Sequence, residues 1–283
     1  MVQGDITRDI DVHARLAPPG DARRMLLAST AALVLGQVVV IALHETSHAV
    51  AGLLLGLTPT QFTSQVRFSP EPTPGQHAVT ALTGPAFSLL SGLLVVALAR
   101  LRPPGWWRLW LAWAGFLSAQ EGIGYLVIAP LVSSGDTGAG LAALSAPGWV
   151  AWAIGAVGVV LMVLLVRRFA AVAVTWARDL YELRAMIVWP WLVGTAVAVL
   201  LELAFLARTA GTQDGDVVAI LLGSASLAVF SPLAMVFWQR ARARQDPTTL
   251  PTQPAPPVPV VAWVLFLVLV LVKLLVVTRG VTW

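Results

Sequence analysis

Two histidines and a glutamate share one short segment of the chain, His44-Glu45-Thr46-Ser47-His48. On a helix, His44 and His48 would project from the same face one turn apart, which lets both imidazoles reach one tetrahedral Zn²⁺ ion. Glu45, beside them, could take a proton from a zinc-activated water and later deliver it to a leaving amine. The segment therefore predicts a hydrolytic zinc centre of the peptidase type.

A catalytic zinc takes three protein ligands and keeps one position for water, so a third donor is needed. The chain has no cysteine, which leaves His, Asp or Glu. We favour Asp136, because the turn-forming stretch 134–138 could bring a carboxylate back toward the histidines. Glu121 is the second candidate, either as ligand or as hydrogen-bonding partner of a ligand histidine. His77 is expected to be a polar residue at the end of an apolar run.

The composition indicates that these residues lie in a membrane protein. Of 283 residues, 58% are hydrophobic and 11% are charged, and the mean hydropathy is +0.81. A soluble domain usually carries about 25% charged residues, so charge is too scarce here to cover a water-exposed surface. A membrane-spanning helix needs about 20 mostly apolar residues, and several stretches satisfy this requirement. We therefore expect an all-α polytopic membrane protein.

Apolar runs between polar breakers predict about seven transmembrane helices, near residues 25–56, 77–99, 106–131, 148–167, 186–207, 216–238 and 258–278. Arginines cluster in alternate loops, which by the positive-inside rule predicts a cytoplasmic N-terminus and an outward C-terminus. This orientation places His44, Gly84 and Asp136 toward the outer face. The net charge of +4 comes mainly from these loop arginines, so it does not indicate nucleic-acid binding.

The expected organisation has five parts. A cytoplasmic N-terminal segment covers 1–24, a three-helix catalytic membrane core covers 25–147, and additional transmembrane helices cover 148–245. Residues 246–259 include six prolines and are expected to form an extended linker. Residues 260–283 contain the last transmembrane helix.

Apolar and polar residues alternate from Gln61 to Phe68, and this period of two indicates a short strand-like segment after the first span. Extended backbone at membrane depth must line a protein cavity or lie at the interface. An ordinary interfacial loop is the alternative interpretation of this segment.

Two further features lie within expected spans. Gly84-Pro85 removes a backbone donor and loosens the second span, which can let a partner helix or a substrate approach closely. Glu202 lies in the fifth span without an evident partner in the sequence, and we assign it no chemistry.

Three separated elements jointly resemble the site-2-protease-type intramembrane zinc metalloproteases. The segment from His44 to Ala49 is similar to the family's zinc motif, and residues 81–90 resemble its Gly-Pro helix. The stretch from Tyr125 to Asp136 resembles the segment that brings an aspartate ligand. The resemblance covers residues 25 to about 140, and the last four spans show no matching feature.

This resemblance implies a multi-pass protein of a prokaryotic plasma membrane that hydrolyses a peptide bond in or next to the membrane. The roles it implies are metal ligands at His44, His48 and Asp136, a catalytic base at Glu45, and substrate positioning by Gly84, Pro85 and Ser88. The Gln61–Phe68 segment is similar in position to a family element that can pair with an unwound substrate.

Zn²⁺ is the expected cofactor, and the expected partners are a membrane protein or peptide substrate and the lipid bilayer, with no nucleic acid. Two alternatives stay open from the sequence. One is a non-catalytic metal-binding membrane scaffold. The other is an ion transporter that uses Glu121, Glu202 and the histidines as a relay, although the chain shows no internal repeat of the kind many transporters have.

Overall fold

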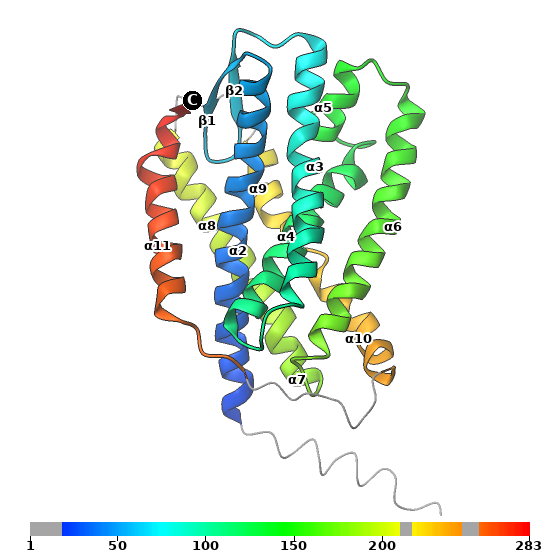
Figure 1. Cartoon of the computed structure of the whole chain (residues 1–283), viewed down its shortest axis with the longest axis vertical. Helices are drawn as coiled ribbons and strands as arrows, with labels where there is room; N and C mark the ends of the chain where they lie inside the picture. Colours follow the sequence, from blue (N-terminus) through cyan, green and yellow to red (C-terminus); the bar gives the residue numbers. More distant parts are fainter. Residues whose placement is uncertain (1–18, 210–216, 245–254) are drawn as a thin grey trace, which may run out of the picture.

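The structure of the protein is a computed structural model that describes residues 19–209, 217–244 and 255–283. Long helices run side by side in one bundle (Figure 1). Six helices of the described residues are long and apolar enough to cross a membrane, as expected for an all-α polytopic membrane protein. They are α2 (Pro19–Leu54), α3 (Pro74–Ala99), α4 (Trp106–Ile128), α6 (Gly148–Ala173), the continuous run of α7 (Leu180–Leu183), a π-helical turn and α8 (Trp189–Thr209), and α11 (Val260–Leu275).

The stretch expected to form a span at 216–238 is divided into two shorter helices, α9 (Val217–Ser226) and α10 (Ala234–Ala243). Ala228 has a positive φ of 68° at the break, which interrupts helical hydrogen bonding. The side chain of Gln120 on α4 donates to the carbonyl oxygen of Ser226 and accepts from the amide of Phe230. Gln120 therefore satisfies backbone groups that the broken helix leaves free, as an apolar environment requires.

Small residues hold α3 and α4 close together. A β-carbon on Gly92 would overlap the backbone of Ala119, and one on Gly122 would overlap the carbonyl oxygen of Pro85. Such contacts are typical of membrane helices, where close backbone approach replaces much of the hydrophobic driving force. The packing of α3 on α4 brings the second and third spans to the face of α2 that carries the two histidines.

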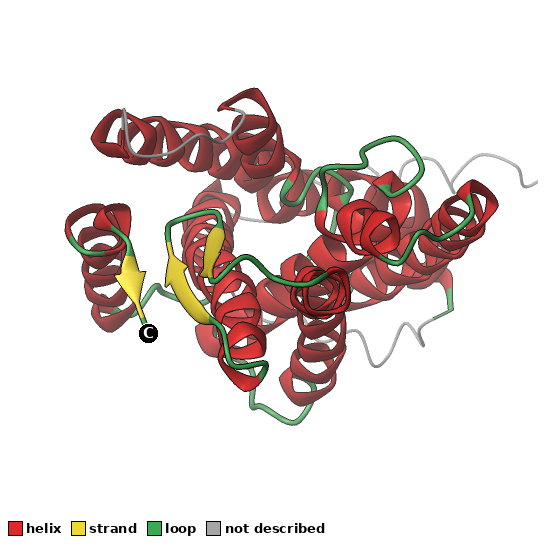
Figure 2. Cartoon of the chain, turned by 90° about the horizontal axis from the view of Figure 1, so that it is seen from above, coloured by secondary structure: helices red, strands yellow, loops and turns green. Residues whose placement is uncertain are grey.

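The segment between α2 and α3 forms a hairpin rather than one strand. β1 (Thr58–Gln61) pairs antiparallel with β2 (Val66–Ser69), and β1 also pairs antiparallel with β3 (Val281–Thr282). The amide of Phe62 donates to the carbonyl oxygen of Gln65, so the chain reverses inside the expected 61–68 strand. Figure 2 shows this small sheet between α11 and the rest of the bundle.

The short helix α5 (Asp136–Ala143) was not expected from the sequence. It follows α4 and packs against α3, where Leu82 fills the space beside Gly140. The turn stretch that carries Asp136 is therefore the start of a helix that is fixed on the second span.

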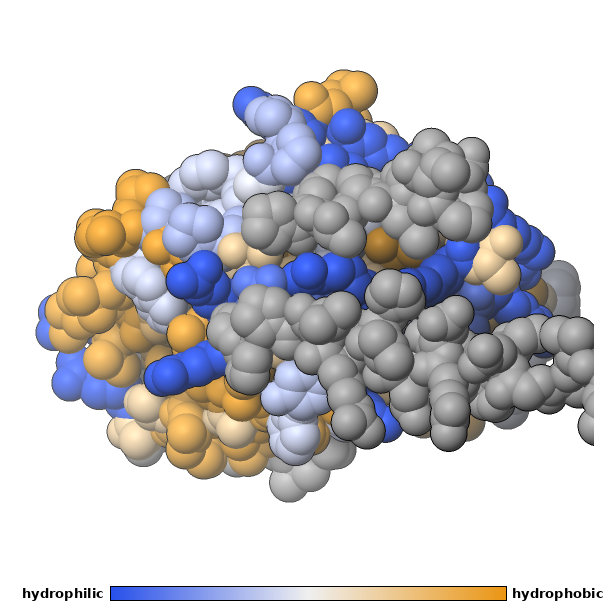
Figure 3. Space-filling view, turned by 90° about the horizontal axis from the view of Figure 1, so that it is seen from below, coloured by the Kyte–Doolittle hydropathy of each residue, from blue (hydrophilic) through white to orange (hydrophobic). Residues whose placement is uncertain are grey.

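The two ends of the bundle differ in character. The sheet and α5 lie at the upper end in Figure 1, together with the C-terminus, while the described chain begins at the lower end. Hydrophilic side chains gather across the lower face (Figure 3). Most of the expected N-terminal segment and residues 246–254 of the expected linker lie outside the described residues, and 255–259 lead directly into α11.

Candidate metal centre

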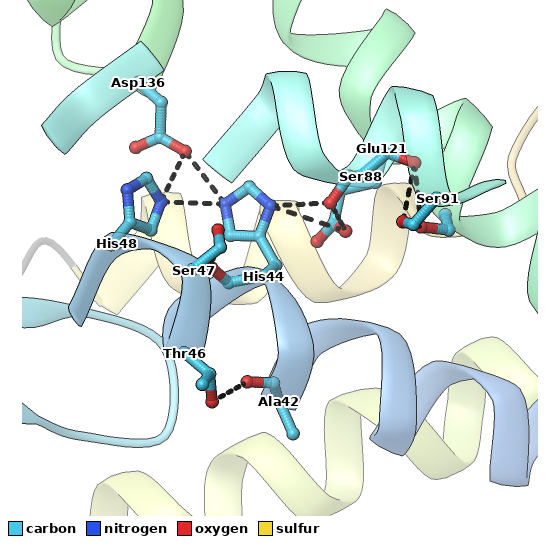
Figure 4. Close-up of polar contacts among 10 residues, drawn as sticks. Ala42, His44, Thr46, Ser47, His48, Ser88, Ser91, Glu121 and Asp136 are labelled. Atoms are coloured by element: carbon cyan, nitrogen blue, oxygen red, sulfur yellow. Dashed lines mark hydrogen bonds and ion pairs between the residues drawn. The ribbon is translucent and has the colours of Figure 1, made fainter. Parts of the chain in front are cut away.

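The histidines of the motif lie on α2 as the spacing predicts, with both imidazoles buried. The Nε2 atoms of His44 and His48 are 3.1 Å apart. Asp136, at the first position of α5, extends its carboxylate between them, and its Oδ2 lies 2.9 Å from His44 Nε2 and 3.3 Å from His48 Nε2. Figure 4 shows these three side chains converging on one point.

The spacing of these three atoms fits a tetrahedral metal ion. Zinc bonds of about 2.0–2.1 Å to nitrogen and oxygen place tetrahedral ligand atoms about 3.3 Å apart. The three observed separations of 2.9, 3.1 and 3.3 Å are close to the edge length of such a tetrahedron. Two imidazole nitrogens and one carboxylate oxygen also form a donor set that catalytic zinc sites use. The three residues could hold a metal ion.

Asp136 is the most accessible member of the group. Its side chain is 26% exposed, compared with 2% for His44 and 9% for His48. Burial alone would raise the pKa of Asp136, but its hydrogen bonds with the two histidines lower the pKa below the usual range. The carboxylate thus carries the negative charge that a cation would bind, and it is the part of the cluster with the most exposed surface.

The other ring nitrogen of each histidine is held by a partner. His48 Nδ1 donates to the carbonyl oxygen of Thr80 at 2.7 Å. His44 Nδ1 lies 3.0 Å from the hydroxyl oxygen of Ser88, which itself donates to Glu121 Oε2 at 2.9 Å. A hydrogen on each Nδ1 leaves the Nε2 lone pairs directed at the convergence point. Metal-binding histidines are usually oriented in this way.

Glu121 lies on the opposite side of the His44 ring from Asp136. Its Oε2 is 3.5 Å from His44 Nδ1, whereas Asp136 contacts Nε2 of the same ring. The two nitrogens of an imidazole point in divergent directions, so a metal ion on Nε2 would lie away from the Glu121 carboxylate. Of the two carboxylates that the sequence left open, the geometry favours Asp136 as the ligand and Glu121 as the group that orients His44 through Ser88.

Gly84 and Pro85 were expected to help position substrate, but in the structure Gly84 packs directly on the histidines. A β-carbon at Gly84 would overlap His48 Nε2 and would lie 2.8 Å from His44 Nε2. Pro85 lies inside α3, and its carbonyl oxygen faces Gly122 of α4. The Gly-Pro pair therefore lets α3 approach both the imidazoles and α4. Ser88, one turn further along the same helix, contacts His44.

Glu45 follows His44 on α2, and its residue is only 8% exposed. Among the described residues its carboxylate has no hydrogen-bond or ion-pair partner. A buried carboxylate without a protein partner is costly unless water or a cation solvates it. Among the described residues nothing solvates the Glu45 carboxylate, so water or a cation is its expected partner.

Two contacts at the site were not predicted from the sequence. Thr80 contributes a backbone carbonyl, which any residue type could supply. Tyr125 stacks on His44 with ring centroids 5.4 Å apart and planes 13° from parallel. Its position one turn after Glu121 on α4 is a signal that could have indicated this contact.

Two other ionisable residues considered from the sequence lie away from the cluster. His77 is exposed in the first turn of α3. Glu202 on α8 is buried and accepts a hydrogen bond from Ser64 of the β1–β2 turn at 3.2 Å. It also borders a narrow cavity with Gln37 and Lys273, a buried lysine of α11 that sequence reasoning did not single out.

Comparison with protein-family models, with curated proteins and with solved structures found no match to this chain.

Proposed function

We propose that the protein is an intramembrane zinc metalloprotease that hydrolyses a peptide bond in or next to the membrane. The observation that carries the proposal is the convergence of His44 Nε2, His48 Nε2 and Asp136 Oδ2 at separations that suit tetrahedral zinc. The shortest of these contacts joins His44 of α2 to Asp136 of α5, and these two residues are 92 positions apart in the chain. The resemblance of the same residues to site-2-protease-type enzymes agrees with this assignment.

His44, His48 and Asp136 are the residues that would hold the ion, with their orientation maintained by Thr80, Ser88 and Glu121. When bound, zinc supplies a Lewis acid that lowers the pKa of water and polarises a carbonyl group. Glu45 is the proposed general base: it takes a proton from the attacking water and returns it to the leaving amine. Its burial, and the lack of a hydrogen-bond or ion-pair partner among the described residues, leave the carboxylate free to contact the attacking water.

The membrane setting supports a membrane-embedded or membrane-adjacent substrate. The motif lies within α2, one of the six apolar helices, and the hairpin beside it is tied to the motif by a 3.3 Å hydrogen bond from Gln61 to Thr46. β1 is paired on both sides, whereas β2 has one neighbour among the described strands. The outer edge of β2 could therefore pair with an extended substrate. A helical substrate would first have to unwind, since a helix hides its carbonyls in internal hydrogen bonds.

The test uses the full chain reconstituted in liposomes with a single-span reporter peptide, together with zinc analysis of the same preparation. Wild-type protein should bind about one zinc per chain and cleave the reporter. Glu45→Gln should retain zinc but lose at least about 100-fold in rate, because it keeps the shape of the side chain and removes general-base catalysis. The matched control is Glu71→Gln, an exposed loop carboxylate outside the cluster, which should leave cleavage unchanged.

Two outcomes would reject parts of the proposal. Full cleavage by Glu45→Gln would eliminate Glu45 as the base. Stoichiometric zinc in the wild type, with no turnover of any of a panel of single-span peptides, would instead indicate a metal-binding membrane scaffold.

A further inference from the structure

A second feature lies at the lower end of the bundle, away from the metal cluster. A cavity of about 370 Å³ is formed between α3, α4 and α6. Its walls are mainly apolar and include Val96, Phe116, Leu165 and Phe169. Nothing in the proposed peptidase chemistry uses this cavity.

Three arginines line the same cavity, and each comes from a different helix. Arg100 directly follows the last residue of α3, Arg108 lies in the first turn of α4, and Arg168 lies near the end of α6. The ends of α3, α4 and α6 that carry these arginines meet at the lower end of the bundle (Figure 1), and all three arginines line the cavity there.

None of the three guanidinium groups has a hydrogen-bond or ion-pair partner among the residues that the structure describes. The only Arg–carboxylate ion pairs there are those of Arg178, which binds Asp21 and Glu182. The acidic residues described at this end are thus engaged elsewhere. Counting only the described residues, no carboxylate pairs with the three arginines that line the cavity, so the cavity should attract an anion.

The cavity opens at the level where a membrane surface is expected. Arg100, Arg168 and the lining residue Ala171 are exposed. Trp106, Trp107 and Trp110 begin α4 in a series of edge-to-face contacts, and tryptophan is enriched at membrane–water interfaces. A ligand in this cavity would have its charged part at the interface and its apolar part beside the hydrocarbon region.

We propose that the cavity binds an anionic phospholipid, with the phosphate among Arg100, Arg108 and Arg168 and an acyl chain along the apolar walls. Basic pockets between transmembrane helices favour anionic head groups. Beyond the three arginines the cavity walls are apolar except for Thr175, whose hydroxyl already donates to the carbonyl oxygen of Val172. A zwitterionic choline lipid would add a positive charge beside three others. Free phosphate would leave the apolar part of the cavity unfilled. This proposal does not depend on the metal site.

The experiment uses the full chain, purified in a non-ionic detergent and titrated with dioleoylphosphatidylglycerol or dioleoylphosphatidylcholine. Native mass spectrometry counts retained lipids, and the unfolding temperature reports binding, since a ligand that binds only the folded state raises it. Dioleoylphosphatidylglycerol, here called the glycerol lipid after its head group, should be retained and should raise the unfolding temperature. Dioleoylphosphatidylcholine, the choline lipid, should do neither. Glycerol 3-phosphate, which has the head-group phosphate without acyl chains, should also have no effect.

The decisive variant is R100Q/R108Q/R168Q, which keeps the apolar walls. Its affinity for the glycerol lipid should fall about 100-fold, because each arginine near an anionic surface contributes a factor of about five. R102Q/R240Q/R244Q removes the same charge from residues that do not line the cavity, and it should bind like wild type. Lysine at the three cavity positions should keep most of the binding.

The proposal is overturned if R100Q/R108Q/R168Q and the control triple variant bind the glycerol lipid equally. It is also overturned if the choline lipid binds as well as the glycerol lipid, or if glycerol 3-phosphate alone stabilises the protein to the same extent. A variant that fails to fold would be recognised by its elution volume and helical circular dichroism, and the single substitution Arg168→Gln, at an exposed position, then takes its place with an expected fivefold loss.

Discussion

Gly84 lies so close to His48 that a β-carbon at position 84 would occupy the space of the Nε2 atom. The same β-carbon would stand 2.8 Å from His44 Nε2. The absence of a side chain on α3 is thus a condition for both imidazoles to reach the point where Asp136 meets them. The neighbouring α3 backbone also receives the hydrogen bond from His48, through the carbonyl oxygen of Thr80.

Gly84→Ala should lower the affinity for zinc about 10- to 100-fold, the range seen when groups that orient metal ligands are disturbed. The methyl group must displace at least one imidazole, because the contact is with ring atoms and not with the end of a flexible chain. Gly124→Ala is the matched control, since a β-carbon there meets no atom within 4 Å. Equal zinc affinity in both variants, measured by competition with a chromogenic chelator, would contradict the packing argument.

Asp136→Ala and Glu121→Gln should separate the ligand from the orienting carboxylate. Loss of Asp136 removes a group that touches both Nε2 atoms, so zinc content after dialysis should fall to a small fraction of the wild-type value. Glu121→Gln keeps a group that can accept from Ser88 and should retain most of the zinc while the cleavage rate falls. Zinc lost from Glu121→Gln and kept in Asp136→Ala would exchange the two roles.

Ser88→Ala removes the group that links His44 Nδ1 to Glu121. The ring of His44 then loses its hydrogen-bond acceptor, and we expect zinc to bind about 10-fold more weakly with the fold intact. Ser91→Ala, one turn away and in contact with Ser118 rather than a histidine, provides the control. Isothermal titration of metal-free protein with zinc gives both affinities, and indistinguishable values would show that Ser88 does not orient the ligand.

Glu202 and Lys273 offer a test of packing between the C-terminal helices and α2. Both are buried, and they border one narrow cavity between α2, α8 and α11. Either Glu202→Leu or Lys273→Leu should destabilise the protein by about 3 kcal/mol, because one buried charge is left without compensation. The double variant should recover most of this loss.

The stability of these variants can be measured from the unfolding midpoint in a denaturing-detergent titration. The exposed loop residue Glu71 supplies a control in Glu71→Leu, which should leave the midpoint unchanged. Additive losses in the double variant would mean that Glu202 and Lys273 do not stabilise each other.

Several elements of the fold follow from local sequence and were predicted. Runs of apolar residues long enough to span a membrane must form helices there, because lipid offers no partner for backbone hydrogen bonds. The predicted ranges of the first four spans therefore lie close to α2, α3, α4 and α6. The fifth span contains a π-helical turn at 184–188, and the apolar content of a segment does not predict such a turn.

Other elements depend on contacts that no short window of sequence contains. The alternation from Gln61 to Phe68 predicts a strand, but a backbone hydrogen bond from Phe62 to Gln65 closes a turn in its middle. The 216–238 stretch is apolar enough for one helix, yet it breaks where Gln120, more than 100 residues earlier, satisfies the freed backbone groups.

The sequence by itself determined that this is a helical membrane protein and that His44 and His48 face the same way, because hydropathy and helical period are local properties. Only the tertiary structure decided which carboxylate meets them. Asp136 and Glu121 are both acidic residues well beyond the histidines in the chain, and the choice depends on how α3 and α4 pack and where α5 begins. The close approach at Gly84 and Gly122 fixes that arrangement, and it places Asp136 at the Nε2 atoms and Glu121 behind the ring of His44.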